Sequence, residues 1–237
     1  MIHNRKTQRA PKTRTAIRQD QISQAALRLT GGYGFRALNI DSLAKEVGVV
    51  PSAIYRHYPS KDAILDALLD LIGQRLQDNV QAIRQERLNA LDRLQHLLIR
   101  HIELVCENKG IPRILFSEEI IGGQLVRRKR LYQIIQDYLA KVAELIREGQ
   151  SQGCIRADLL PDTVSVMFLG LVQPAVILHL LSEDQFSVLK FQVEAWQIFR
   201  QMLQTENRTA WLRKPTESDE GHNNKKPHIN EETKHEK

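Results

Sequence analysis

The stretch from Leu38 to Lys61 constrains the fold of this chain more than any other. Its first part spaces apolar residues as one face of a helix does, and Gly48 follows where a helix commonly ends in a left-handed conformation. Pro51 suits the first turn of a second, short helix, and Ser60 can cap a third. The spacing therefore predicts two helices joined by a tight turn, which is a helix-turn-helix pattern.

Helical periodicity extends through most of the remaining chain, and no segment alternates in the manner of a strand. We expect an all-α fold, with an N-terminal three-helix helix-turn-helix domain followed by a larger helical domain for ligand binding and dimerisation. The expected helices outside the Leu38–Lys61 stretch cover about 15–30, 61–86, 88–107, 112–121, 131–152, 163–182 and 185–204. The predicted divisions are a disordered basic arm, the helix-turn-helix domain, the larger domain and a disordered polar tail, at 1–14, 15–60, 61–204 and 205–237.

Positive charge is concentrated in the same part of the chain as the helix-turn-helix pattern. The 237 residues carry a formal net charge of +6, and residues 1–60 contain ten Lys/Arg against three Asp/Glu. Residues 61–203 are nearly balanced, with 17 basic and 18 acidic side chains. A basic surface binds polyanions with release of counterions, so the sequence predicts double-stranded DNA as a partner. The alternative is a basic terminus that is simply solvated.

The sequence offers no chemistry for an enzyme or a metal site. Cys106 and Cys154 lie in separate helical regions, without the Cys/His spacing of a metal site, and no nucleophile-base order or glycine-rich phosphate loop is present. We therefore expect no catalytic residues, no metal and no cofactor. The cysteine usage, the lack of a signal peptide and the lack of about 18 consecutive apolar residues predict a cytoplasmic protein without a membrane span.

Residues 163–182 are apolar on almost every side, interrupted inside by only Ser165, Gln173 and His179. A helix of this kind is expected to be buried all round. With residues 185–204 it can supply half of a symmetric four-helix interface in a homodimer, or it can be the central helix of a monomeric core. The predicted interface residues are Val164, Phe168, Leu171, Ala175, Leu178, His179, Leu189, Val193 and Trp196.

Residues 17–65 resemble the N-terminal domain of the TetR/AcrR-type bacterial transcriptional regulators, most specifically in AIYRHYPSK at 53–61. Beyond residue 65 the resemblance is one of all-helical architecture. Val50 departs from the pattern, since the family usually has a Ser or Thr cap there. The resemblance implies a homodimeric, ligand-responsive repressor that binds a near-palindromic DNA operator and is released by an unidentified small-molecule effector.

The residue types in the helix-turn-helix suit two kinds of DNA contact. Hydroxyl, imidazole and ammonium donors suit phosphate oxygens, and the candidates are Tyr55, His57, Tyr58, Ser60 and Lys61. The candidates for contacts with base edges are Val50, Pro51, Ser52 and Arg56. Asn39 is a further predicted DNA-binding residue and is also expected to cap the second helix of the domain. Tyr55 has a second possible role, packing in the small core.

The effector site is expected among polar or aromatic interruptions of apolar helix faces. The candidates are His101, Cys106, Phe116, Glu119, Tyr138 and Gln173, and each has a structural alternative as a core or surface residue. A different function fits the same pattern, namely a DNA-binding protein whose C-terminal domain binds protein partners. A buried cavity of a few hundred Å³ favours the effector, whereas a packed core with an exposed apolar patch favours the protein partner.

Overall fold

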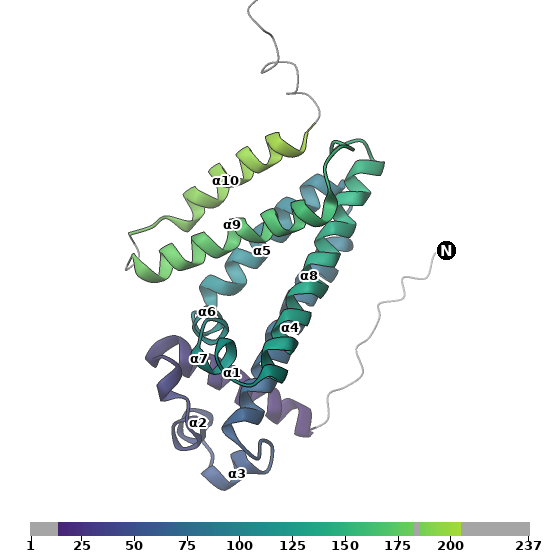
Figure 1. Ribbon diagram of the computed structural model, residues 1–237. Coiled ribbons are helices and arrows are strands. Elements are labelled where there is room, and N and C mark those ends of the chain that lie inside the picture. Colours follow the sequence, from purple (N-terminus) through teal and green to yellow (C-terminus); the bar gives the residue numbers. More distant parts are fainter. Residues whose placement is uncertain (1–13, 183–184, 205–237) are drawn as a thin grey trace, which may run out of the picture. The chain divides into compact units, whose positions relative to one another are not determined.

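The computed structural model describes residues 14–182 and 185–204, and every regular element in them is helical (Figure 1). The all-α prediction is therefore confirmed over the described residues. The predicted arm, up to residue 13, and the predicted tail lie outside them. The elements are α1 (Arg14–Tyr33), the short 3₁₀ helix η1 (Phe35–Ala37), α2 (Ile40–Val47), α3 (Pro51–Tyr55), α4 (Lys61–Arg84), α5 (Ala90–Glu107), α6 (Gly110–Leu115), α7 (Glu118–Ile121), α8 (Leu125–Ser151), α9 (Pro161–Leu181) and α10 (Val188–Leu203).

Local signals in the sequence place the ends of α2 where they were predicted. Asn39 caps the helix, and its side-chain oxygen accepts a hydrogen bond from the Ser42 amide at 2.8 Å. Gly48 follows the last residue with a φ of 73°, a left-handed conformation that costs a glycine little. The turn into α3 is therefore set by these two residues at the ends of α2.

The next helix, α3, begins without a side-chain cap. Val50 occupies the cap position and makes no capping hydrogen bond, as its apolar side chain requires. Pro51 follows at the first helical position, where its fixed φ favours the helix and its missing N–H leaves one fewer donor to satisfy. At the start of α4 the predicted cap is present, because the Ser60 hydroxyl oxygen accepts from the Ala63 amide at 3.1 Å.

The backbones of α1 and α6 touch at a pair of glycines. A Cβ on Gly31 would lie 2.9 Å from the Gly110 nitrogen, and a Cβ on Gly110 would lie 2.2 Å from the Leu27 carbonyl oxygen. Arg113 of α6 also donates to the Thr30 carbonyl at 3.4 Å. One hydrophobic core runs from α1 to α10, so the helix-turn-helix region is packed directly against the helices that follow.

Helix α9 differs from its prediction, because only part of its surface is buried. It runs unbroken through Pro174 and packs against α5, α8 and α10, while its other face is exposed (Figure 1). Composition showed that α9 is apolar all round, but it could not show which side lacks a covering helix within one chain.

Among the described residues, α9 is the one helix that is long and apolar enough to be a candidate membrane span. Its most apolar 18-residue window has a mean hydropathy of 2.1, and a third of that window is buried. Length and composition therefore match a membrane span. Helix α9 also contacts three other helices, so it forms one side of the helical bundle.

Candidate DNA-binding surface and effector cavity

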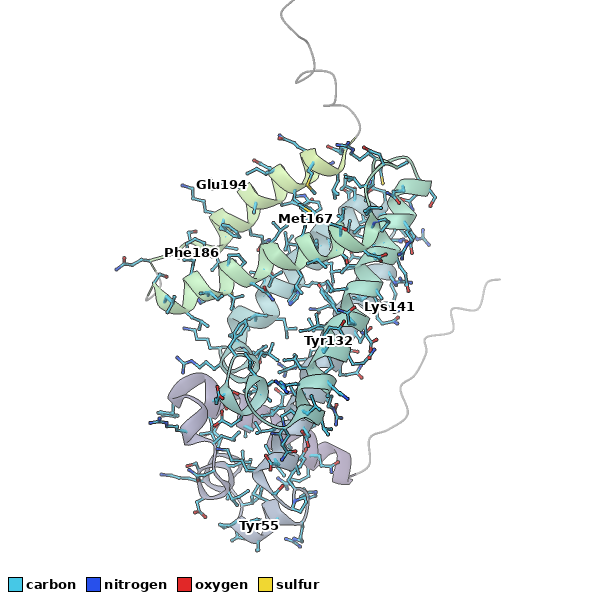
Figure 2. The ribbon with its side chains drawn as sticks, viewed as in Figure 1. Tyr55, Tyr132, Lys141, Met167, Phe186 and Glu194 are labelled. Carbon is cyan, nitrogen blue, oxygen red and sulfur yellow. The ribbon has the colours of Figure 1, made fainter. Side chains whose placement is uncertain are left out.

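The helix α3 and the residues that flank it form an exposed surface. Val50 is 62% exposed and Tyr55 is 53% exposed (Figure 2), and Pro51, Ser52 and Arg56 are exposed as well. The alternative in which Tyr55 packs in the core does not describe a ring that is more than half exposed. The short helix thus presents apolar, hydroxyl, phenol and guanidinium groups side by side.

Tyr58 is an exception to the predicted phosphate contacts. Its ring is buried in the core, and its hydroxyl lies 3.1 Å from the Ser23 hydroxyl and donates to the Gln19 carbonyl at 3.3 Å. Burial also raises the pKa of this phenol above its usual value. We therefore correct its assignment, because Tyr58 fastens the helix-turn-helix to α1 and its hydroxyl is not presented to DNA.

The start of α4 keeps the groups that suit a phosphate. Because the Ser60 oxygen accepts from the Ala63 amide, its hydroxyl proton can still be donated outward. Lys61 is exposed at the first position of the helix, where unpaired N–H groups and the helix dipole favour an anion. Asn39 is exposed too, but its oxygen caps α2, so it acts through the position of that helix.

A groove of about 380 Å³ between α1 and α3 adds a residue that the sequence analysis missed. It is lined by Arg18, Arg56 and His57 together with three apolar side chains. The His57 Nδ1 atom is buried and has no hydrogen-bond partner among the described residues. Arg18 lies in the basic N-terminal quarter of the chain, and only the folded structure shows that it lines the same groove as Arg56.

A separate cavity of about 90 Å³ lies among α4, α5, α6, α8 and α9. Four of the six predicted effector residues line it: His101, Phe116, Tyr138 and Gln173. The rest of the wall is aliphatic apart from Pro112. Cys106 and Glu119 do not line this cavity, which corrects those two assignments. Cys106 is half-buried against the core, and Glu119 is exposed on α7.

The two ionisable residues of the cavity wall form a buried pair. His101 Nδ1 lies 2.9 Å from the Tyr138 hydroxyl, and the rings meet edge to face with centroids 5.0 Å apart. Burial lowers the pKa of His101 to about 4 and raises the pKa of Tyr138 well above its usual value. Both groups are therefore uncharged near neutral pH, and no lining residue supplies a charge.

The lowered pKa of His101 predicts an acid sensitivity of the fold. Between pH 6.5 and 4 the unfolded state binds a proton that the folded state excludes, so the free energy of unfolding falls as the pH drops through that window. Above pH 6.5 this residue contributes no pH dependence. We expect His101→Gln to reduce the loss of thermal stability between pH 7 and pH 5, measured by circular dichroism. Equal losses in variant and parent would contradict this account.

The predicted dimer residues fall into two groups. Val164, Phe168, Ala175 and Trp196 are buried within the protomer, so their assignment to the interface is corrected. Leu171 and His179 are half-buried, whereas Leu178, Leu189 and Val193 are exposed. An apolar stripe on α9, here called the exposed α9 face, consists of Val166, Met167, Gly170, Pro174, Ile177, Leu178 and Leu181.

Comparison with known proteins covers both halves of the chain. Residues 22–68 match the family described as bacterial regulatory proteins, tetR family, and residues 70–202 match the C-terminal region of YsiA-like proteins. The nucleoid occlusion factor SlmA of Shewanella woodyi is 30% identical over 186 residues, which are 78% of this chain and 94% of that protein. The SlmA protein of Marinomonas sp. is 24% identical over the same shares.

Solved structures share the fold. FadR from Bacillus subtilis, in complex with stearoyl-CoA, has a TM-score of 0.65 at 20% identity, covering 78% of this chain and 98% of that chain. A regulator from Saccharomonospora viridis in complex with choline has a TM-score of 0.67 at 22% identity, covering 78% and 96%. Together with the sequence matches, this shows that the chain belongs to the tetR family of bacterial regulatory proteins, all-α DNA-binding transcriptional regulators with an N-terminal helix-turn-helix.

Proposed function

We propose that this protein is a transcriptional repressor that binds a near-palindromic operator as a homodimer and is released by a small, largely apolar effector. One observation carries the proposal. The helix α4 begins at Lys61 beside the exposed α3 surface and supplies Ile72 and Leu76 to the wall of the cavity. Eleven residues of helix span about 16 Å, so one continuous helix joins the two candidate sites.

In this proposal α3 enters the major groove. Val50 and Pro51 contact thymine methyl groups, Ser52 bonds a base edge, and Arg56 is placed to bond guanine. Tyr55, Ser60 and Lys61 bind phosphate oxygens, and His57 and Arg18 bind phosphate from the groove between α1 and α3. Such contacts with one half-site are weak alone, so a dimer with two recognition helices about 34 Å apart is needed. A cytoplasmic location follows from the DNA target.

We assign the dimer contact to the exposed α9 face and to Leu189 and Val193 of α10. Together they offer apolar side chains from two neighbouring helices, whereas a monomer rarely exposes a large contiguous apolar patch. Pairing this surface with its copy about a two-fold axis forms a four-helix interface.

The effector is proposed to be uncharged in the part that enters the cavity. A charged group there would meet aliphatic walls, a neutral imidazole and a neutral phenol, and would lose its hydration without a counter-charge. His101, Tyr138 and Gln173 can bond a single polar group of the ligand. The structural neighbour FadR holds stearoyl-CoA, which carries such a hydrocarbon chain.

The size of the cavity bears on the mechanism. About 90 Å³ is less than the roughly 300 Å³ that a small-molecule site usually offers. An effector must therefore move the walls, which include α4, and it thereby favours a state with displaced recognition helices. The same displacement lowers operator affinity, since the coupling between two ligands is reciprocal.

The proposal can be tested with DNA selected from random duplexes. The selected sequences are expected to be near-palindromic, with half-sites one helical turn apart. Addition of stearoyl-CoA, with coenzyme A alone as the control, is expected to release the labelled operator in fluorescence anisotropy. Selection that yields no preferred sequence, or a cavity-lining Val172→Phe variant with unchanged operator affinity, would argue against the proposal.

A second candidate function is supported by the relatives and by the surface of α7 and α8. The curated relatives are named nucleoid occlusion factors, and the chain exposes Ile121, Leu125, Val126 and Tyr132 near the start of α8. Under this hypothesis the C-terminal helical domain binds a protein partner while the recognition helices bind DNA. DNA selection succeeds in both cases, but only this candidate predicts that Val126→Glu abolishes binding of a protein partner and leaves operator affinity unchanged.

The two tyrosines of the recognition motif provide a prediction about the phosphate contacts. Lys61→Ala and Tyr55→Phe are each expected to weaken operator binding, and Lys61→Ala is expected to reduce the slope of log affinity against log salt by about one. Tyr58→Phe removes a hydroxyl that bonds α1. It is expected to lower thermal stability and to leave the salt slope unchanged. If the salt slope of Lys61→Ala equalled that of the parent protein, the proposed contact between Lys61 and phosphate would be wrong.

A further inference from the structure

Arg127, the third residue of α8, is a buried cation that reaches the first two turns of α4. Its Nη2 donates to an Asp62 carboxylate oxygen at 2.9 Å and its Nε donates to Asp66 at 3.0 Å. The Arg127 side chain is 4% exposed, whereas those of Asp62 and Asp66 are 58% and 42% exposed. Burial of a guanidinium costs free energy unless its hydrogen bonds are made, so Arg127 requires its carboxylate partners on α4.

The turn between α7 and α8 helps to hold the Arg127 side chain in place. The Arg127 Nη1 also donates to the Glu119 carbonyl at 3.4 Å, so the guanidinium contacts α7 as well as α4. In the turn from α7 to α8, a Cβ on Gly123 would lie 2.1 Å from that same carbonyl oxygen. Only glycine fits there, and the close turn brings α8 back over α7 with Arg127 above α4.

The contacts of Arg127 lie next to the proposed phosphate-binding groups. Asp62 directly follows Lys61, and Ser60 caps the same turn. We propose that Arg127 is a positioning residue for DNA binding, which fixes the first turn of α4 so that Ser60 and Lys61 meet the phosphate backbone. This inference rests on the phosphate contact in the proposed function.

Arg130, one turn further along α8, provides the comparison that separates positioning from ordinary ion pairing. It pairs with Asp70, two turns beyond Asp62 on α4, and both side chains are about half exposed. The two arginines therefore join the same pair of helices through the same chemistry. Only Arg127 is buried, has two carboxylate partners and acts on the DNA-proximal turn.

The same contact joins the cavity to the DNA-binding surface. Helix α8 continues from Arg127 to Ile135 and Tyr138, which line the cavity. Eight to eleven residues of helix correspond to about 12–16 Å, so α8 can carry a displacement of the cavity wall as a rigid rod. Arg127 then passes that displacement to the first turn of α4.

The test compares Arg127→Met, Lys61→Ala, the double variant and the control Arg130→Met, using the full chain and operator DNA selected from random duplexes. Arg127→Met is expected to lower operator affinity by about ten-fold and the salt slope by about one, as Lys61→Ala does. The operator affinity of the double variant is expected to lie within about two-fold of that of the weaker single variant, because both changes remove the same phosphate contact. Arg130→Met should match the parent protein.

Several outcomes would overturn the inference. A parental salt slope for Arg127→Met, with a reduced slope for Lys61→Ala, refutes the role of Arg127 alone. A parental slope for both variants refutes the phosphate contact itself. Multiplying losses in the double variant indicate independent effects, and rescue of Arg127→Met by Asp62→Asn indicates charge compensation instead of positioning. If Arg127→Met does not fold, Arg127→Lys, which retains one carboxylate contact, is expected to give an intermediate slope.

Discussion

Replacement of Ile177 by glutamate is expected to separate the homodimer into folded monomers. Ile177 belongs to the exposed α9 face and is 41% exposed in the protomer. The substitution therefore disturbs the contact with a partner subunit more than it disturbs the packing within the protomer. At a two-fold interface each substitution is present twice, and an unpaired carboxylate in an apolar contact costs several kcal/mol. Sedimentation velocity should show the change in mass, with helical circular dichroism unchanged.

Loss of the dimer should also remove most of the operator affinity. Two linked recognition helices bind more tightly than one by about 100-fold or more, through effective concentration alone. Tyr132→Glu is the control, because Tyr132 is a large exposed side chain on α8, away from α9 and α10 (Figure 2). A dimer that persists in Ile177→Glu, or dissociates in Tyr132→Glu, would show that the interface lies elsewhere.

Replacement of Phe168 by alanine is expected to have the opposite pattern of effects. Its ring is fully buried in the protomer and packs on Phe199 of α10, with centroids 6.1 Å apart. Truncation of a buried phenylalanine leaves a cavity and costs about 3–5 kcal/mol of unfolding free energy. For a chain of this size the melting temperature should fall by roughly 10 °C. Below that temperature the protein should remain dimeric.

Val166 provides the matched control on the same helix. It is more than half exposed on the exposed α9 face, two residues from Phe168. Val166→Ala is expected to change the unfolding free energy of the protomer by less than about 1 kcal/mol. If the two variants lost the same stability, the burial of Phe168 within one chain would be the wrong explanation.

At α9 the sequence predicts the apolar character of the helix but does not predict which of its side chains are buried in the protomer. Its apolar composition predicted a helix buried on every side, either against a partner subunit or inside a monomeric core, whereas one face of the helix is exposed in the protomer. Periodicity could not separate Phe168 from Ile177, since every side of the helix is apolar. Only the packing of α5, α8 and α10 on one side distinguishes the core residues from the exposed ones.

The helix-turn-helix was predictable because its signals are local. The caps at Asn39 and Ser60, the left-handed Gly48 and Pro51 at the start of α3 each act within four residues. The role of Tyr58 was not predictable, because its hydroxyl is bonded by residues of α1 that lie 35 and 39 positions away in sequence.

The cavity was predictable in part, for a similar reason. Polar and aromatic residues that interrupt an apolar helix face are often found at cavities, and His101, Phe116, Tyr138 and Gln173 all line one. Cys106 and Glu119 carry the same signal in the sequence and lie elsewhere. Whether such a residue lines the cavity depends on the rotation of α5 and on the position of α7. The type of side chain does not predict either of these.

The contact between Gly31 and Gly110 restricts how such a chain can be altered by recombination. Because a Cβ on Gly31 would meet the Gly110 backbone and a Cβ on Gly110 would meet the Leu27 carbonyl, α1 and α6 have to be kept together when domains are exchanged. A chimera that joins the DNA-binding region of this protein to another helical domain at residue 60 would place an unmatched surface against Gly31. Exchange of DNA specificity is therefore more feasible within residues 48–57 than across the whole N-terminal region.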